Sequence, residues 1–272
     1  GTGGLLYDYN YLTTTAGSLS KLGVIETSSG FYFVDILNKC ICFCNGQSVI
    51  NLSDKEGFHA ELINTLSYED LINDNPVSGY GINLGYNSTN KDVYFSFSQK
   101  DDSFTLCFNE RTQSFTSYYD YVPSWFINKG SVMISTNPDS NELWQHFKGN
   151  SNSFYGKTFP SSITFHIVAQ KKELVMNGAS YRLEMEDSQG NLMPNEGLTS
   201  VQVWTKYLES KDTKLVPRKN AFRRIRDWNI KLPRVENSRD RVRGPWSYAK
   251  FTLENNSGKK MILHDVTIFY TE

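Results

Sequence analysis

The chain has 272 residues, and its 28 Lys and Arg against 29 Asp and Glu give a formal net charge of −1. A nearly neutral chain has no general attraction to nucleic acid or to a membrane surface. A mean hydropathy of −0.47 and the lack of any run of about 18 apolar residues exclude a transmembrane helix. Aromatic residues make up 14% of the chain, and because they fit the half-buried surface of a sheet, the composition favours β structure.

The N-terminal part is predicted to form short strands that begin close to the first residue. The chain starts with glycine and continues at once into the strand-like segment 7–15, which predicts a piece of a longer protein. Three strand-like segments follow, at 31–35, 40–44 and 49–53. The dipeptide at 45–46 is Asn-Gly, which tolerates the positive φ angles of a hairpin turn and therefore predicts that the second and third segments pair.

Four cysteines are present, and three of them alternate along one predicted strand. Cys40, Cys42 and Cys44 therefore point to one face of that strand, and Cys107 stands apart. This is not the spacing of a zinc site, in which pairs of cysteines flank a turn. The four are predicted to be buried small hydrophobes in a reduced protein.

A second set of strand-like segments repeats the order of the first and predicts propeller-like blades. It comprises 93–97, 103–108 and 114–119, and three further segments up to residue 147 continue the meander. Repeated antiparallel units of three or four strands are typical of β-propeller blades. A helical insertion is expected near 54–72, because Ser53 and Glu56 have the spacing of a capping box. The segments that match between the two sets are 31–33 with 93–95, 42–45 with 106–109, and 47–49 with 113–115.

A change of pattern near 150–162 predicts a domain boundary. That segment is rich in Asn, Ser, Gly and Pro, which is typical of a loop. After it, about six strands of 7–10 residues alternate apolar and polar side chains, which favours a β-sandwich. We therefore predict an all-β chain with two domains, in which propeller-blade-like antiparallel meanders with one short helical insertion (1–158) precede a β-sandwich (159–272).

The residue types that carry catalysis or bind metals do not form a recognisable motif. His264 and Asp265 are adjacent, but neighbours on a regular strand point to opposite faces and cannot act together. His166 is also expected to be an ordinary strand residue. Glu184 and Glu186 share one face, as paired carboxylates of a glycosidase do, but such pairs are common on solvated strands. We therefore predict a protein that is not an enzyme, with no metal and no cofactor.

The most unusual feature is a cluster of arginines between residues 218 and 243. Arg224, Arg226 and Trp228 share a face if their segment is one strand, and the arginines of 239–243 also alternate. Two rows of guanidinium groups are then expected side by side. They would bind phosphates, pair with carboxylates of the same or a neighbouring subunit, or form a solvated face. The carboxylate interpretation is favoured because the rest of the chain has an acidic surplus. The candidate residues are Arg223, Arg224, Arg226, Arg234, Arg239, Arg241 and Arg243.

The order of three C-terminal motifs, FRRIRDWNIKLPR, RDRVRGPW and KFTLENNSGKKMILHDVTIFY, resembles the end of the tail muzzle (nozzle) proteins of crAss-like bacteriophages. The blade-like segment 93–128 is similar to the propeller part of the same family. The resemblance covers about residues 20–272 and lies in the C-terminal portion of those longer proteins.

The resemblance implies a structural virion protein that forms part of the distal channel of the tail. Its partners would be further copies and other tail proteins in a ring, with transient contact with DNA in the channel. Its location would be the virion tail, assembled in the cytoplasm of the bacterial host. The alternative is a carbohydrate-binding or adhesion protein of a gut bacterium, in which Trp125, Trp144 and Trp204 stack on sugars.

Overall fold

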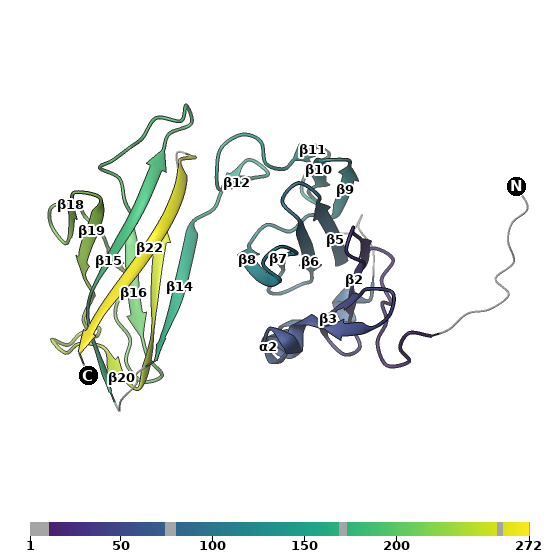
Figure 1. Ribbon diagram of the computed structural model, residues 1–272, viewed down its shortest axis with the longest axis horizontal. Coiled ribbons are helices and arrows are strands. Elements are labelled where there is room, and N and C mark those ends of the chain that lie inside the picture. Colours follow the sequence, from purple (N-terminus) through teal and green to yellow (C-terminus); the bar gives the residue numbers. More distant parts are fainter. Residues whose placement is uncertain (1–10, 74–79, 169–172, 255–257, 272) are drawn as a thin grey trace, which may run out of the picture. The chain divides into compact units, whose positions relative to one another are not determined.

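The computed structural model describes residues 11–73, 80–168, 173–254 and 258–271, which divide into two compact units. The first unit runs from Gly1 to Lys148 and the second from Gly149 to Glu272. Both consist mostly of β-strands in antiparallel sheets, with three short helices in the first unit (Figure 1). None of the helices in the described ranges has the length and hydropathy of a membrane-spanning segment.

The first unit contains three consecutive antiparallel meanders. In each of them the strands are neighbours in the order in which they occur in the chain, so only short turns connect them. The first sheet comprises β1 (Val24–Glu26), β2 (Phe31–Asp35), β3 (Cys40–Cys44) and β4 (Val49–Asn51); the second comprises β5 (Gly81–Asn87), β6 (Asp92–Ser98), β7 (Phe104–Asn109) and β8 (Ser114–Tyr119); the third comprises β9 (Trp125–Lys129), β10 (Val132–Thr136) and β11 (Leu143–Gln145).

The first two sheets share a turn as well as a strand order. Asn45 directly follows the third strand of the first sheet, and its side-chain oxygen accepts hydrogen bonds from the backbone N–H groups of Gln47 and Ser48, both at 2.9 Å. Asn109 holds the same position in the second sheet and accepts from Arg111 at 2.9 Å and from Thr112 at 3.0 Å. An asparagine that closes its own turn in this way fixes the register of the hairpin. The repeat seen in the sequence is therefore a repeat of structure.

Three short helices connect the first and second sheets. They are α1 (Leu52–Lys55), α2 (His59–Thr65) and α3 (Tyr68–Leu71). The side chain of Asn51 caps α1 by accepting a hydrogen bond from the backbone N–H of Asp54. Ser53 is fully buried and does not cap the helix. Its hydroxyl instead accepts from the backbone N–H of Ile41 at 2.8 Å. The capping box predicted at Ser53 is therefore wrong, because the helix and its cap lie two residues earlier and Ser53 contacts the sheet.

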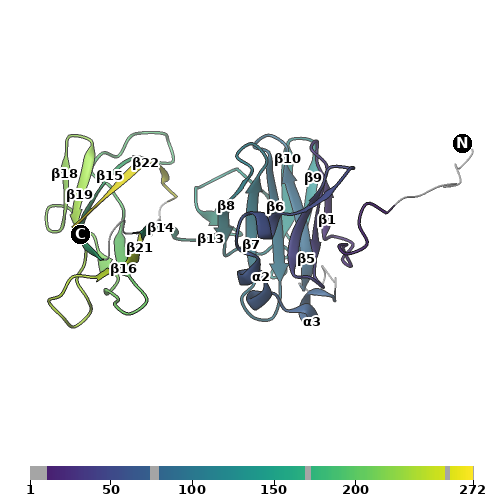
Figure 2. The same cartoon turned by 60° about the horizontal axis from the view of Figure 1, so that its bottom comes forward.

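The second sheet is packed on both faces, which explains the aromatic content of this unit. Val93, Phe95 and Phe97 point into a core shared with the first sheet, and Tyr94, between them, points into a core shared with β9 and β10. Figure 2 shows the strands β5, β6 and β7 of this sheet. Gly85 makes the second contact possible, since a Cβ at this position would lie 2.6 Å from the ring of Phe126. The strands therefore have buried residues at both parities.

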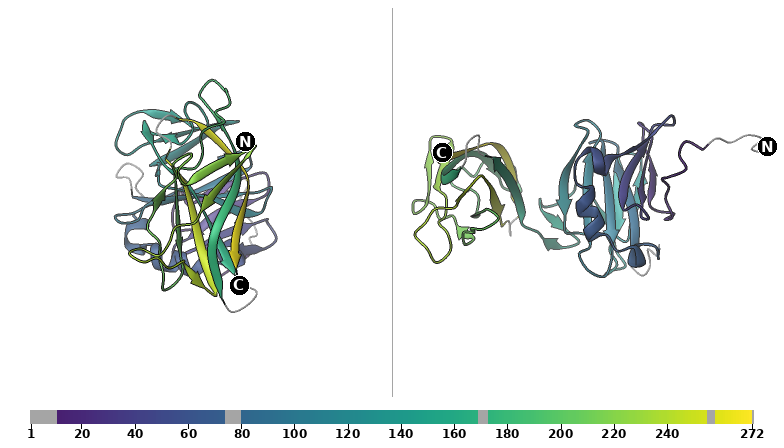
Figure 3. Two further views of the ribbon diagram at one scale, coloured as in Figure 1. Left: turned by 90° about the vertical axis from the view of Figure 1, so that its left-hand side faces the viewer. Right: turned by 90° about the horizontal axis from the view of Figure 1, so that it is seen from below.

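The second unit contains a small hairpin and two larger sheets. The hairpin of β12 (Ser153–Phe154) and β13 (Lys157–Thr158) lies where a boundary loop was predicted. One large sheet has the order β14 (Ser161–Val168), β21 (Trp246–Leu253), β16 (Ser200–Trp204) and β17 (Thr213–Lys214). The other has β18 (Ala221–Arg224), β19 (Asp227–Lys231), β15 (Leu174–Glu186) and β20 (Arg243–Gly244), and β22 (Lys260–Thr271) also pairs with β15 (Figure 3).

The two large sheets contribute to one hydrophobic core. Tyr181 and Trp228 enter it from the sheet that contains β15, and their rings are nearly parallel with centroids 6.4 Å apart. Val203 and Phe251 enter from the other sheet. Along β15, buried and exposed residues alternate towards its C-terminal end. This sheet therefore has one face on the core and one face in solvent, and the solvent face carries the candidate site.

The cysteines are free, as predicted. Cys40, Cys42 and Cys107 are buried, and Cys44 is half-buried. Cys40 and Cys42 lie on one face of β3 with their sulfur atoms 3.6 Å apart, packed with Phe33. The interpretation of these residues as small buried hydrophobes is confirmed.

Candidate functional site

The arginine-rich segment 221–231 is a hairpin and not a single strand. β18 ends at Arg224, Ile225 and Arg226 form the turn, and β19 begins at Asp227. Ile225 adopts a φ of 60°. The chain reverses here, so Trp228 is buried opposite Arg223 while Arg224 is exposed opposite Asp227. The predicted common face of Arg224, Arg226 and Trp228 is therefore wrong.

The two predicted rows of arginine do not lie side by side. Asp227, at the end of the hairpin, pairs with Arg182 on β15. Arg243 pairs with Val175, near the start of the same strand. Seven residues of extended strand separate these positions, or roughly 23 Å. The sequence cluster therefore divides into a hairpin group (Arg223, Arg224 and Arg226) and a loop group (Arg234, Arg239, Arg241 and Arg243), at opposite ends of β15 (Figure 1).

The loop group binds mostly backbone oxygens. Arg241 donates to the carbonyls of Met176 and Asn177, at 3.3 and 3.1 Å. Arg234 donates to the carbonyl of Arg239. Arg243 faces a carboxylate at the limit of an ion pair, with its Nε 4.0 Å from Glu173. Arg241 and Arg243 thereby hold the end of the segment 234–243 against the start of β15, which is a structural role within the unit.

Arg224 of the hairpin group belongs to a row of alternating charges across the exposed face of the sheet. Arg224 on β18 lies opposite Asp227 on β19, which lies opposite Arg182 on β15, which lies opposite Asp265 on β22. Within this row, Arg182 and Asp265 form an ion pair with 2.7 Å between nitrogen and oxygen. Cross-strand neighbours of opposite charge attract one another, which is consistent with the alternation of charge along this row.

A β-bulge adds His264 to this exposed face. The register between β15 and β22 shifts between Arg182 and Leu183, which pair with Asp265 and Leu263, so that His264 is the extra residue. A bulge re-aims a side chain that regular pleating would turn away. His264 approaches Glu184 at 3.4 Å while Asp265 contacts Arg182. The expectation that His264 and Asp265 point to opposite faces is therefore wrong, although each binds a residue of β15 and not the other.

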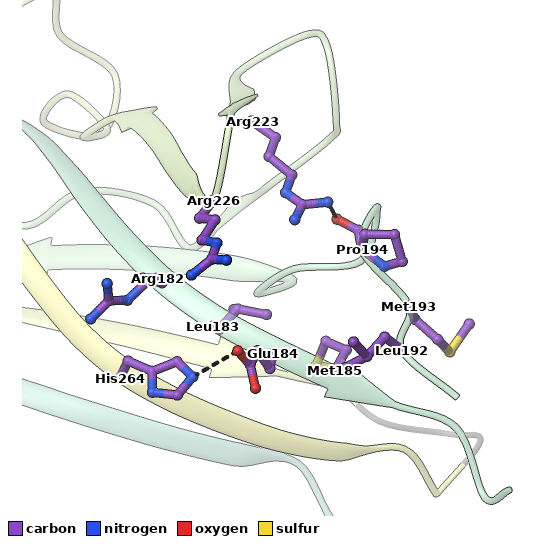
Figure 4. A pocket seen from close by; sticks show the side chains of 10 residues that line it. All are labelled: Arg182, Leu183, Glu184, Met185, Leu192, Met193, Pro194, Arg223, Arg226 and His264. Carbon is purple, nitrogen blue, oxygen red and sulfur yellow. Dashed lines mark hydrogen bonds and ion pairs between the residues drawn. The ribbon is translucent and has the colours of Figure 1, made fainter. Parts of the chain in front are cut away.

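A cavity of about 410 Å³ opens beside the bulge, between β15, the hairpin and the loop that follows β15. Three arginines from two elements line it: Arg182 from β15, and Arg223 and Arg226 from the hairpin. In Figure 4 the guanidinium group of Arg182 points away from those of Arg223 and Arg226. Arg223 donates to the carbonyl of Pro194. The side chain of Arg226 has no partner within the described part of the chain, and we call this cavity the arginine pocket.

The opposite wall of the arginine pocket is apolar. Leu183 and Met185 on β15 and Leu192, Met193 and Pro194 on the following loop form this wall. A wall of this kind beside cationic groups fits a ligand with an anionic head and an apolar body. Within the described ranges, no cluster of His, Cys, Asp and Glu side chains could hold a metal ion.

Comparison with known proteins identifies the family of the chain. A family model described as Crassvirus muzzle protein matches residues 1–139. The chain belongs to this family. A relative, the "Muzzle protein" of Bacteroides phage crAss001, is 31% identical over 267 residues, which cover 96% of this chain. The chain spans 19% of the length of that muzzle protein. The suspected relationship to muzzle proteins is thus confirmed.

In this member of the muzzle family, the three tryptophans considered for sugar stacking do not form one surface. Trp125 lies opposite Thr136, whereas Trp144 lies opposite the adjacent residue Ser135, so the two point to opposite faces of their sheet. Trp204 lies in the second unit, where the ring of Tyr248 stacks on it with centroids 5.4 Å apart. One face of Trp204 is therefore already occupied.

Sequence reasoning missed two residues of the arginine pocket in this muzzle-family chain. Arg182 stands in an ordinary alternating strand, so nothing local distinguishes it from a solvated arginine. His264 was considered but not placed in the site, because the bulge that exposes it has no glycine to mark it. Arg182 is distinguished by its cross-strand neighbours, Asp227 on β19 and Asp265 on β22. These neighbours can be recognised only when the order of the strands in the sheet is known.

Proposed function

We propose that the chain is a structural part of a phage tail and has no enzymatic activity. The observation that supports this role is the 31% identity with a muzzle protein along nearly the whole chain. In this proposal the chain assembles in the host cytoplasm, with further copies of itself and with other tail proteins, into a ring around the distal tail channel. Its location in the particle is the virion tail.

The architecture proposed for this role is a set of propeller-like blades followed by a β-sandwich. Two antiparallel meanders with the same turn, packed face to face through a shared core, support the blade interpretation. Two antiparallel sheets that share one core support the sandwich interpretation. DNA that leaves through the channel would meet the arginines of the second unit only transiently.

Labelling of intact virions tests the proposed location. Antibodies raised against the purified 272-residue chain should bind the distal end of the tail in electron micrographs of the phage that encodes it. Mass spectrometry of the same particles should recover peptides from both units. The proposal fails if the protein is absent from purified particles, or if the label lies on the capsid.

A further inference from the structure

The two units carry opposite net charges, although the whole chain is nearly neutral. The first unit has 8 Lys and Arg against 16 Asp and Glu, a net charge of −8. The second has 20 Lys and Arg against 13 Asp and Glu, a net charge of +7. Surfaces of opposite charge on the same molecule attract each other between copies and orient their encounter.

The arginine pocket places three arginines of the second unit beside apolar surface. Arg226 has no counter-ion among the described residues, and Arg182 shares only one carboxylate, that of Asp265. Leu192 next to them is 64% exposed. Exposed apolar surface beside a guanidinium group without a counter-ion is typical of the contact regions of proteins, where arginine is enriched.

The first unit has a surface patch with the complementary chemistry. Tyr118 on β8 is 59% exposed, and its ring stacks on Phe104 with centroids 5.2 Å apart. Burial of part of the ring, and the negative charges of Asp120, Asp102 and Glu61, raise the pKa of Tyr118. The three carboxylates are all exposed. We call Glu61, Asp102, Tyr118 and Asp120 the acidic patch, which combines carboxylates with an apolar ring.

We infer that the arginine pocket of one copy binds the acidic patch of a second copy, so that copies associate head to tail. Carboxylates of the patch pair with Arg182 and Arg226, and the ring of Tyr118 covers the apolar wall of the pocket. Such a contact joins two different surfaces and leaves one of each free, so it generates rings or open chains of subunits. This inference rests on the proposed role in an assembly of identical subunits, and it names the contact.

The composition of the pocket favours a protein carboxylate over a nucleic acid or a sugar. None of the described residues that line the pocket is Phe, Tyr or Trp, and its one imidazole, that of His264, lies 3.4 Å from Glu184. The pocket therefore offers no large aromatic face on which a base or a pyranose would stack. Glu184 at its edge and Asp265 beside Arg182 would repel a continuous phosphate backbone. Separate carboxylates set around one apolar ring present no continuous line of negative charge and need no aromatic surface, and guanidinium groups bind carboxylates through paired hydrogen bonds.

Two sets of variants of the full 272-residue chain test the contact by sedimentation velocity. The pocket variant is Arg182→Ala with Arg226→Ala, and the patch variant is Glu61→Ala with Asp120→Ala. Because these side chains are exposed, the variants should fold. We expect the wild type to self-associate, with a dissociation constant at least about tenfold lower than that of either variant. The controls are Arg239→Ala and Asp139→Ala, exposed charges of the same units outside the two surfaces.

A mixture of the two variants gives the decisive result. The pocket variant retains its acidic patch and the patch variant retains its pocket, so an equimolar mixture should form pairs although neither variant self-associates. A mixture that stays monomeric, or a wild type that is monomeric at near-millimolar concentration, overturns the inference. So does binding of oligothymidylate that falls steeply with salt and is lost in the pocket variant, because the ligand is then a phosphate. None of these outcomes depends on labelling of the virion, which tests the proposed function alone.

Discussion

The second sheet of the first unit (β5 to β8, the central sheet) and the sheet of the second unit that contains β15 differ in how many of their faces are buried. The first is packed on both faces, and its strand β6 is buried at nearly every position. The second is packed on one face, and β19 alternates between exposed and buried residues. A sheet covered on both sides has no surface for charged side chains, whereas a one-sided sheet can carry a row of them. The candidate site is accordingly found on the second sheet.

The largest expected effect on stability comes from removing the aromatic ring of a buried phenylalanine from the central sheet. Phe95 is fully buried at the centre of β6, so Phe95→Ala should lower the free energy of unfolding of the first unit by about 3–5 kcal/mol. Phe222 on the exposed face of the second unit is 49% exposed, and Phe222→Ala should change stability by no more than about 0.5 kcal/mol. Urea unfolding followed by fluorescence measures both. Equal costs would show that the two sheets are packed alike.

The free energy of unfolding of the first unit should fall at acid pH because of a buried histidine, His146, which follows the last strand of the third sheet. Burial lowers the pKa of His146 to about 4, and its Nε2 lies 2.6 Å from the hydroxyl of Ser135. The unfolded chain binds a proton near pH 6.5 and the folded chain does not, so stability falls as the pH drops from about 6.5 towards 4. The full loss is about 3 kcal/mol. His59 has the opposite sign, because its hydrogen bonds to the Asn38 carbonyl and to Asp54 raise its pKa.

A matched variant isolates the contribution of His146. His146→Gln keeps a polar group near Ser135 but cannot titrate, so the difference in unfolding free energy between pH 7 and pH 4 should shrink by most of the predicted loss. Denaturant titrations at a series of pH values measure it. An unchanged pH dependence in the variant would mean that another group causes the acid sensitivity.

The next largest loss of stability is expected from a substitution at Gly85, where β5 closely approaches β9. A Cβ at Gly85 would lie 2.6 Å from the ring of Phe126, so Gly85→Ala should cost about 1–3 kcal/mol. Gly17 has no atom within 4 Å of the same position, and Gly17→Ala should be nearly neutral. Thermal unfolding compares them. If Gly85→Ala were neutral, the second face of the central sheet would be loosely packed, and the contrast with the second unit would be lost.

The sequence predicted most of the first unit because its signals are local. Segment 114–119 was predicted with the bounds of β8, and Asn45-Gly46 marked the hairpin of β3 and β4, because alternation and turn residues act over a few positions. The hairpin at 225–226 was missed, since isoleucine at a φ of 60° is an unusual turn residue that no sequence rule anticipates. The arginine pocket was missed in part for another reason. It assembles side chains from β15, the hairpin and a loop, and only the strand order brings them together.

The smallest expected effect on stability concerns the row of alternating charges that contains Arg182 and Asp265. These residues should contribute little to stability, while Arg182 should contribute to self-association. Arg182 and Asp265 are 45% and 52% exposed, and solvent screens an exposed ion pair, so a double-mutant cycle with alanine at both positions should give a coupling energy of about 0.2–1 kcal/mol. Phe95→Ala, by contrast, acts in the first unit alone. If the coupling exceeded about 2 kcal/mol, the row would be a structural element of the sheet. A small coupling, together with loss of self-association in the Arg182→Ala and Arg226→Ala variant, would show that the one-sided sheet keeps its exposed arginines for a partner.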